Sequence, residues 1–119
     1  MPDLNRQELI KILAVTNQAR LSGVDLSGMN LSGLNFAQTD LTRVNLSGSN
    51  LNNAYLRGAR LEEANLEGTV LTNANLKEAN LKGANLKNAD LTGANLTDAN
   101  LFGANLQNTK LNQVKGYQV

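Results

Sequence analysis

From Leu21 onward, a large apolar residue recurs at every fifth position of the chain. The series runs unbroken through nineteen units to Leu111, and Phe36 is the one member that is not a leucine. Alanine stands two positions before this residue in eleven units, and asparagine or aspartate stands one position before it in fourteen. Nine of the ten glycines fall two positions after it, so the repeating unit reads Ala-Asn-Leu-X-Gly.

A period of five fits neither a helix nor a flat strand. In an α-helix, successive leucines would lie about 140° apart, so no face would become apolar. In a flat strand, they would point to opposite faces. The pattern fits a chain that bends once per unit, with Ala and Leu facing inward, Asn facing outward and X-Gly at the corner. Repeated bends in one sense predict a β-solenoid, in which short extended segments stack in coils.

The unit Ala-Asn-Leu-X-Gly resembles the A(D/N)LXX signature of the pentapeptide-repeat family, and the resemblance covers residues 19–114. It implies an all-β solenoid, a right-handed quadrilateral β-helix with four units in each coil. The periodicity alone does not exclude three sides. We expect about five coils and three segments: an N-terminal capping helix at 1–18, the β-helix at 19–114 and a tail at 115–119. The family is abundant in cyanobacteria, so the resemblance also implies a cyanobacterial-like protein.

The N-terminal segment differs from the repeat, because its apolar residues recur at helical spacing. This pattern predicts a short amphipathic helix at about 4–15, built on Leu4, Leu9, Ile10, Ile12 and Leu13. Either Asn5, with Glu8 three residues later, or Asp3, which follows Pro2, marks its start. We expect the helix to cap the first coil, since an open solenoid end exposes unpaired backbone. The alternative is a helix that binds a membrane surface or a partner.

The C-terminal residues 113–119 offer too few apolar side chains for a second lid. An uncovered terminal coil invites self-association, so we expect a homodimer through the C-terminal coil. Some members of the pentapeptide-repeat family dimerise through a terminal coil, and the resemblance therefore points the same way. A few apolar side chains occupy positions that are usually polar in the unit, and others come after the last unit. We take three of these residues as candidates for protein contact: Phe102, Tyr55 and Tyr117.

Composition narrows the classes of function. The chain has no His and no Cys, so it lacks the usual ligands of zinc, haem and iron–sulfur clusters, together with His bases and Cys nucleophiles. We therefore expect no catalytic residue, no metal site and no cofactor. We interpret Asp25, Asp40 and Asp90 as structural rather than catalytic or cation-binding, since they replace Asn at a repeat position.

Charge argues against nucleic acid as a direct ligand, because the net charge is only +1. Residues 20 apart should stack on adjacent coils, which predicts ion pairs between Glu62 and Lys82 and between Glu67 and Lys87. No apolar stretch is long enough to span a membrane, and no secretory leader is recognisable, so we expect a cytoplasmic location.

We therefore expect a non-enzymatic protein–protein interaction scaffold or regulator with an unidentified protein partner. The alternative is a DNA mimic that binds DNA gyrase, as the quinolone-resistance branch of the family does. The resemblance implies a long acidic dimer for that branch, and a net charge of +1 departs from it. An enzyme is a third class, but the left-handed β-helices that host acyltransferases have a six-residue period and commonly use His.

Overall fold

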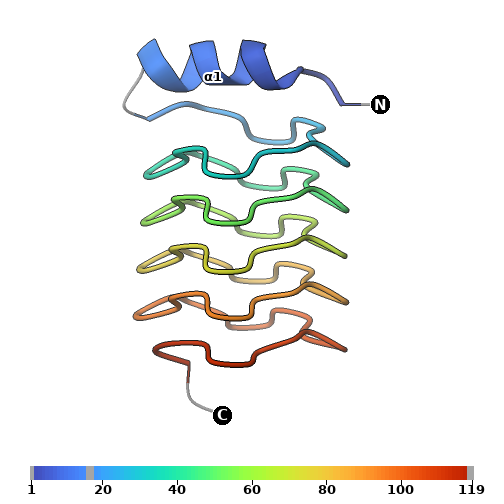
Figure 1. Ribbon diagram of the computed structural model, residues 1–119, viewed down its shortest axis with the longest axis vertical. Coiled ribbons are helices and arrows are strands. Elements are labelled where there is room, and N and C mark those ends of the chain that lie inside the picture. Colours follow the sequence, from blue (N-terminus) through green and yellow to red (C-terminus); the bar gives the residue numbers. More distant parts are fainter. Residues whose placement is uncertain (1, 16–17, 118–119) are drawn as a thin grey trace.

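The structure, a computed structural model, describes residues 2–15 and 18–117. One helix, α1 (Arg6–Val15), lies across the top of a rod of stacked coils, as Figure 1 shows. The predicted capping segment and tail also include residues 1, 16–17 and 118–119, which lie outside the described residues. The rod and helix together extend 37 Å along the longest axis.

Each coil is 20 residues long, because every bridged residue pairs in parallel with the residue 20 positions later. The bridges form four ladders, which settles the number of sides at four. We name each side by its first rung. The Arg20 side stacks Arg20, Asp40, Arg60, Asn80 and Asn100. The other ladders are the Asp25 side (Asp25, Asn45, Asn65, Asn85, Asn105), the Asn30 side (Asn30, Asn50, Val70, Asp90, Lys110) and the Asn35 side (Asn35, Tyr55, Asn75, Asn95, Lys115).

Every unit turns the corner with the same backbone conformation. The residue two positions after each leucine has a positive φ, between 55° and 73°, from Gly23 to Gln113. The next N–H commonly bonds back to the leucine carbonyl, as Val44 N–H does to Leu41 O at 3.0 Å. A positive φ at the third of four turn residues is the signature of a type II turn. Non-glycine residues such as Arg43 and Glu63 adopt it too, so the stacking of coils overrides local preference.

The core is a continuous column of leucine and alanine from all four sides. The leucines at every fifth position from Leu26 to Leu91 are 0–1% exposed, and so are the alanines from Ala54 to Ala94. Leucines of the last coil are partly exposed, because no further coil covers them within the described residues. The predicted inward columns are thus confirmed. The leucine column ends where Gly116 replaces leucine, and a side chain at that glycine would collide with Thr97.

Helix α1 begins with a capping box, which resolves the open choice of its start. Glu8 N–H donates to Asn5 Oδ1 at 2.8 Å, and Asn5 N–H donates to Glu8 Oε1 at 2.9 Å. These bonds satisfy two of the free amides at the helix start. Leu9 is fully buried against the first coil, whereas Ile10 is 41% exposed. The assignment of Ile10 to the buried face was therefore wrong, since the face of α1 that contacts the coil is narrower than the spacing of its apolar residues indicated.

Candidate interaction surfaces

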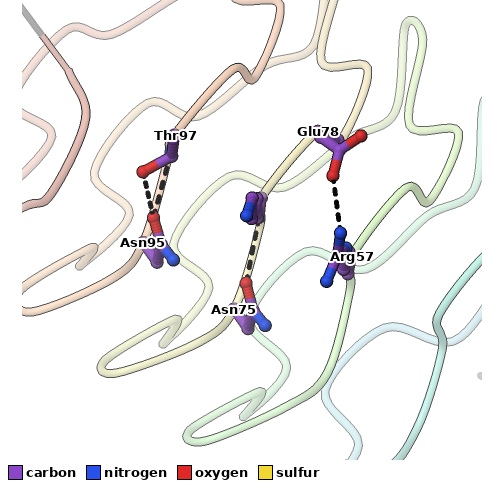
Figure 2. A network of polar contacts seen from close by, with 6 residues as sticks. Arg57, Asn75, Glu78, Asn95 and Thr97 are labelled. Carbon is purple, nitrogen blue, oxygen red and sulfur yellow. Dashed lines mark hydrogen bonds and ion pairs between the residues drawn. The ribbon is translucent and has the colours of Figure 1, made fainter.

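Each outward Asn or Asp of the repeat holds the corner that follows it. In all fourteen units with Asn or Asp at this position, its Oδ1 accepts the backbone N–H two residues later, as Asn75 does from Lys77 at 3.1 Å. Threonine at the X position adds a second bond, as Thr97 Oγ1 does to Asn95 Oδ1 at 2.6 Å (Figure 2). These are Asx turns, which explains why Asn and Asp dominate here.

The three aspartates at this position make the same bonds as the asparagines. Asp40 Oδ1 accepts from the Thr42 hydroxyl at 2.7 Å and from its N–H at 3.1 Å, and Asp90 does the same with Thr92. These bonds favour the charged carboxylate, so they hold the pKa of Asp40 and of Asp90 below the usual 3.8. The geometry matches the structural interpretation, since the same bonds occur with a neutral amide elsewhere.

Acidification is expected to weaken the coils at Asp40 and Asp90. A carboxylate whose folded pKa is depressed stabilises the fold above its unfolded pKa, and this contribution is lost as the pH falls through the folded pKa. The urea concentration at the midpoint of unfolding should therefore decrease once the pH is lowered below about 3.9, the unfolded pKa of Asp. It should fall less in the double variant Asp40→Asn, Asp90→Asn, because Asn45 makes the same bonds to Ser47 without a charge. Identical pH profiles of parent and variant would contradict this account.

Asp3 closes one edge of the first coil by imitating a strand above it. Its N–H donates to Asp25 O at 2.6 Å, and its Oδ2 accepts Asp25 N–H at 2.8 Å. One coil further on, Asn45 bonds in the same two directions, to Leu26 N–H and to Val24 O, through backbone alone. Asp3 is therefore an edge cap rather than the start of the helix.

Arg6 closes the neighbouring edge through its guanidinium group. Nη1 donates to Asn30 O at 2.8 Å, and Nη2 donates to Ser32 O at 3.2 Å. Between coils, such carbonyls accept a backbone N–H, as Asn50 O does from Leu31 at 2.7 Å. Sequence reasoning missed the role of Arg6 and Asp3 at these edges, because nothing in the helical pattern says which polar residue bonds the backbone of the first coil. No described helix is long and apolar enough to cross a membrane.

The C-terminal face of the rod is uncovered within the described residues. In the preceding coil, Leu81 N–H donates to Asn100 O at 2.7 Å. In the last coil, the amides that point away from the rod donate no hydrogen bond within residues 2–15 and 18–117: Leu101, Gly103, Leu106, Asn108, Leu111 and Gln113. The three leucines among them are partly exposed. This face therefore combines unpaired backbone with apolar side chains, which is the usual character of an interacting edge.

The candidate contact residues do not form one site. Phe102 is 76% exposed and lies in the last coil at the corner that follows the Arg20 side, at the rim of the uncovered face. Tyr55 is 55% exposed on the second rung of the Asn35 side. Lys115 lies on the same side, three rungs after Tyr55. Tyr117 comes two residues later and packs, partly buried, against the core. Only Phe102 and Tyr117 therefore belong to the C-terminal end.

The stacked ion pairs expected from the 20-residue spacing are absent from the part of the chain that the structure describes. That prediction was wrong for Glu62 with Lys82 and for Glu67 with Lys87. Instead, Arg57 Nη2 donates to Glu78 Oε1 at 3.0 Å, a diagonal pair between adjacent coils (Figure 2). Exposed pairs gain at most about 1 kcal/mol and must immobilise two long side chains, so spacing alone does not select them.

Sequence comparison identifies the repeat. A family model described as pentapeptide repeats matches residues 19–58, 49–88 and 79–115, with eight copies. No curated protein matches the chain.

Among solved structures, the chain is similar to a pentapeptide repeat protein from the thylakoid lumen of Arabidopsis thaliana, at 32% identity and a TM-score of 0.76. The match covers 81% of this chain and 66% of that one, so the chain spans just under two thirds of its length. Rfr23 from the cyanobacterium Cyanothece 51142 is 34% identical over 92% of this chain and 93% of its own, with a TM-score of 0.44.

QnrB1, a plasmid-mediated fluoroquinolone resistance protein, is 20% identical over 81% of this chain and 57% of its own, with a TM-score of 0.47. A likeness at that level carries no functional argument. The family match and the Arabidopsis structure confirm the right-handed quadrilateral β-helix. The capping helix is α1 of the structure itself, which precedes the matched residues. The match spans residues 19–115, and the chain belongs to the pentapeptide repeat family.

Proposed function

We propose that the chain is a non-enzymatic interaction protein that binds protein through its uncovered C-terminal coil. The observation that supports this proposal is the difference between the two ends. Asp3, Arg6 and α1 close the first coil, whereas the last coil presents partly exposed leucines and amides that have no partner among the described residues. Without His or Cys, the side walls lack the common catalytic bases and nucleophiles.

A second copy of the chain is one partner that fits this face. Two C-terminal coils placed face to face would each cover the leucines of the other and bring two strand edges together. Phe102 lies at the rim, where it would extend the apolar contact. Because α1 occupies the opposite end, association of this kind stops at two copies.

The oligomeric state tests the proposal. We expect light scattering over a concentration series to show a monomer–dimer equilibrium, which Leu106→Asp together with Phe102→Asp abolishes by adding charge to the face. Tyr55→Asp is the matched control, because it changes an exposed aromatic residue on a side wall and should leave the equilibrium unchanged. A parent protein that stays monomeric throughout, or variants that dimerise like the parent, would overturn the homodimer.

The gyrase-binding alternative has no specific observation in its favour. The net charge of +1 gives no surplus of negative charge to imitate DNA, and the likeness to QnrB1 carries no argument about function. A supercoiling assay with purified gyrase tests it directly, and inhibition at low protein concentration would revive it.

The cytoplasmic location stays a prediction, and one similar structure is that of a thylakoid-lumen protein. Fractionation of the native host with an antibody against the chain tests it. The division into a cap at 1–18, a β-helix at 19–114 and a tail at 115–119 is likewise a proposal, which limited proteolysis tests.

A further inference from the structure

The Arg20 side carries three charges of alternating sign at its N-terminal end. Arg20, Asp40 and Arg60 are successive rungs of one ladder, about 4.8 Å apart. Together with Gln18 and Gln38 they line a hollow of about 210 Å³. Gln38 lies across the next corner, where a side chain at Gly58 would collide with its amide. Among the described residues, no other ladder has three consecutive charged rungs.

These charges keep unused capacity for hydrogen bonds. Neither Arg20 nor Arg60 forms a hydrogen bond or an ion pair through its guanidinium within residues 2–15 and 18–117. Asp40 accepts both Thr42 bonds on Oδ1, and its Oδ2 accepts none from the described residues. The positive charges of Arg60 and Arg20 also help to lower the pKa of Asp40, so the carboxyl group is ionised at neutral pH. The hollow therefore offers three groups in a row: the N–H donors of the Arg20 guanidinium, the acceptor Oδ2 of Asp40 and the N–H donors of the Arg60 guanidinium.

We propose that this hollow binds a free acidic amino acid, with two carboxylates flanking one ammonium group. Each carboxylate pairs with one guanidinium, whose fork of N–H donors matches a carboxylate in two parallel hydrogen bonds. The ammonium group donates to Asp40 Oδ2. The ligand then presents charges of negative, positive and negative sign to a wall of positive, negative and positive sign.

Asp40 makes the hollow selective between anions. Inorganic phosphate or a plain dicarboxylate would meet both guanidinium groups but would leave Asp40 unpaired beside a like charge, which costs affinity. An acidic amino acid converts that repulsion into a charge-assisted hydrogen bond. Selection therefore depends on the ammonium group, even though each exposed ion pair alone is weak.

The site goes beyond the proposed function and is separate from it in space. It lies on the first three rungs of a side wall, whereas the uncovered face belongs to the last coil. Ligand binding should therefore leave the monomer–dimer equilibrium unchanged, and either proposal can fail without the other.

Titration by nuclear magnetic resonance tests the site on the full chain, with the arginine Nε–H signals as the readout. The probes are L-glutamate, glutarate, which has the same two carboxylates and no ammonium group, and inorganic phosphate. We expect L-glutamate to shift the Arg20 and Arg60 signals saturably. Its affinity should be at least about tenfold higher than that of glutarate, as one added hydrogen bond between charged groups implies.

Three variants assign the roles. Arg60→Gln should weaken the binding of L-glutamate and glutarate alike, and Asp40→Asn should erase the preference for L-glutamate. Arg57→Gln is the matched control, because Arg57 is an exposed arginine already paired with Glu78, and it should change neither affinity. The proposal is overturned if L-glutamate gives no saturable shift, if glutarate binds as tightly, or if Arg57→Gln weakens binding as much as Arg60→Gln. The comparison of ligands on the parent protein decides the matter even if a variant fails to fold.

Discussion

Replacing Leu66 with alanine is expected to lower the free energy of unfolding by about 2–5 kcal/mol. Leu66 is fully buried in the third coil, between Leu46 and Leu86 of the same inward column, which are also 0% exposed. The coils above and below are held at a fixed spacing by parallel bridges, so the interior cannot close around the missing atoms. The cavity term then adds to the lost burial.

Urea denaturation measures this effect, and the chain offers a matched control in the same column. In the monomer, at low protein concentration, Leu106 is partly exposed in the last coil, so Leu106→Ala removes the same atoms where less apolar surface is buried. It should shift the midpoint clearly less than Leu66→Ala does. Equal midpoints for parent and Leu66→Ala would refute the assignment of this column to the core.

Deleting residues 2–16 is expected to uncover the first coil, so that the rod can associate through its N-terminal end as well as its C-terminal end. The deletion removes Leu9, which is fully buried against the first coil. It also removes Asp3 and Arg6, which bond backbone groups of that coil. The first coil would then expose Met29 and Leu34 together with unpaired carbonyls. Edges of this kind pair with other chains, so we expect association beyond the dimer.

Light scattering and thermal unfolding check the deletion together. The truncated chain should show a mass that grows with concentration and a lower unfolding temperature than the parent. Ile10→Ser is the control, because it changes an exposed apolar residue of α1 and leaves the buried face intact. A truncated protein that stays monomeric and unfolds at the parent's temperature would contradict the role of α1 as a cap.

Much of the fold could be predicted because a period of five has few physical solutions. The inward column of Leu66, the outward Asn75 and the corner at Gly23 all follow from one bend per unit. The number of sides did not follow, because three or four bends close a coil equally well on paper. Ten corners without glycine adopt the same positive φ, since bonds from neighbouring coils outweigh the local preference of residues such as Arg43.

The candidate sites were harder to predict, because they depend on where long side chains end. The spacing placed Glu62 next to Lys82, but flexible side chains on a wet surface are not held by spacing. The pairing of Arg57 with Glu78 crosses a corner, at 21 residues rather than 20. The row of Arg20, Asp40 and Arg60 is readable from the 20-residue spacing, but their unpaired state becomes visible only with the side chains in place.

Because every corner makes the same turn, each added five-residue unit lengthens a pentapeptide solenoid by one side, which is a quarter of a coil. Inserting four units adds one rung to each ladder and leaves every later residue on its own side. Inserting a single unit moves each later residue to the neighbouring side, so Asn100 would leave the side that carries Arg20 and Arg60, and Phe102 would move to the next corner. Duplication within the gene therefore preserves the side surfaces of the rod only when it adds whole coils. A single added unit changes which residues share a side throughout the part of the rod that follows it.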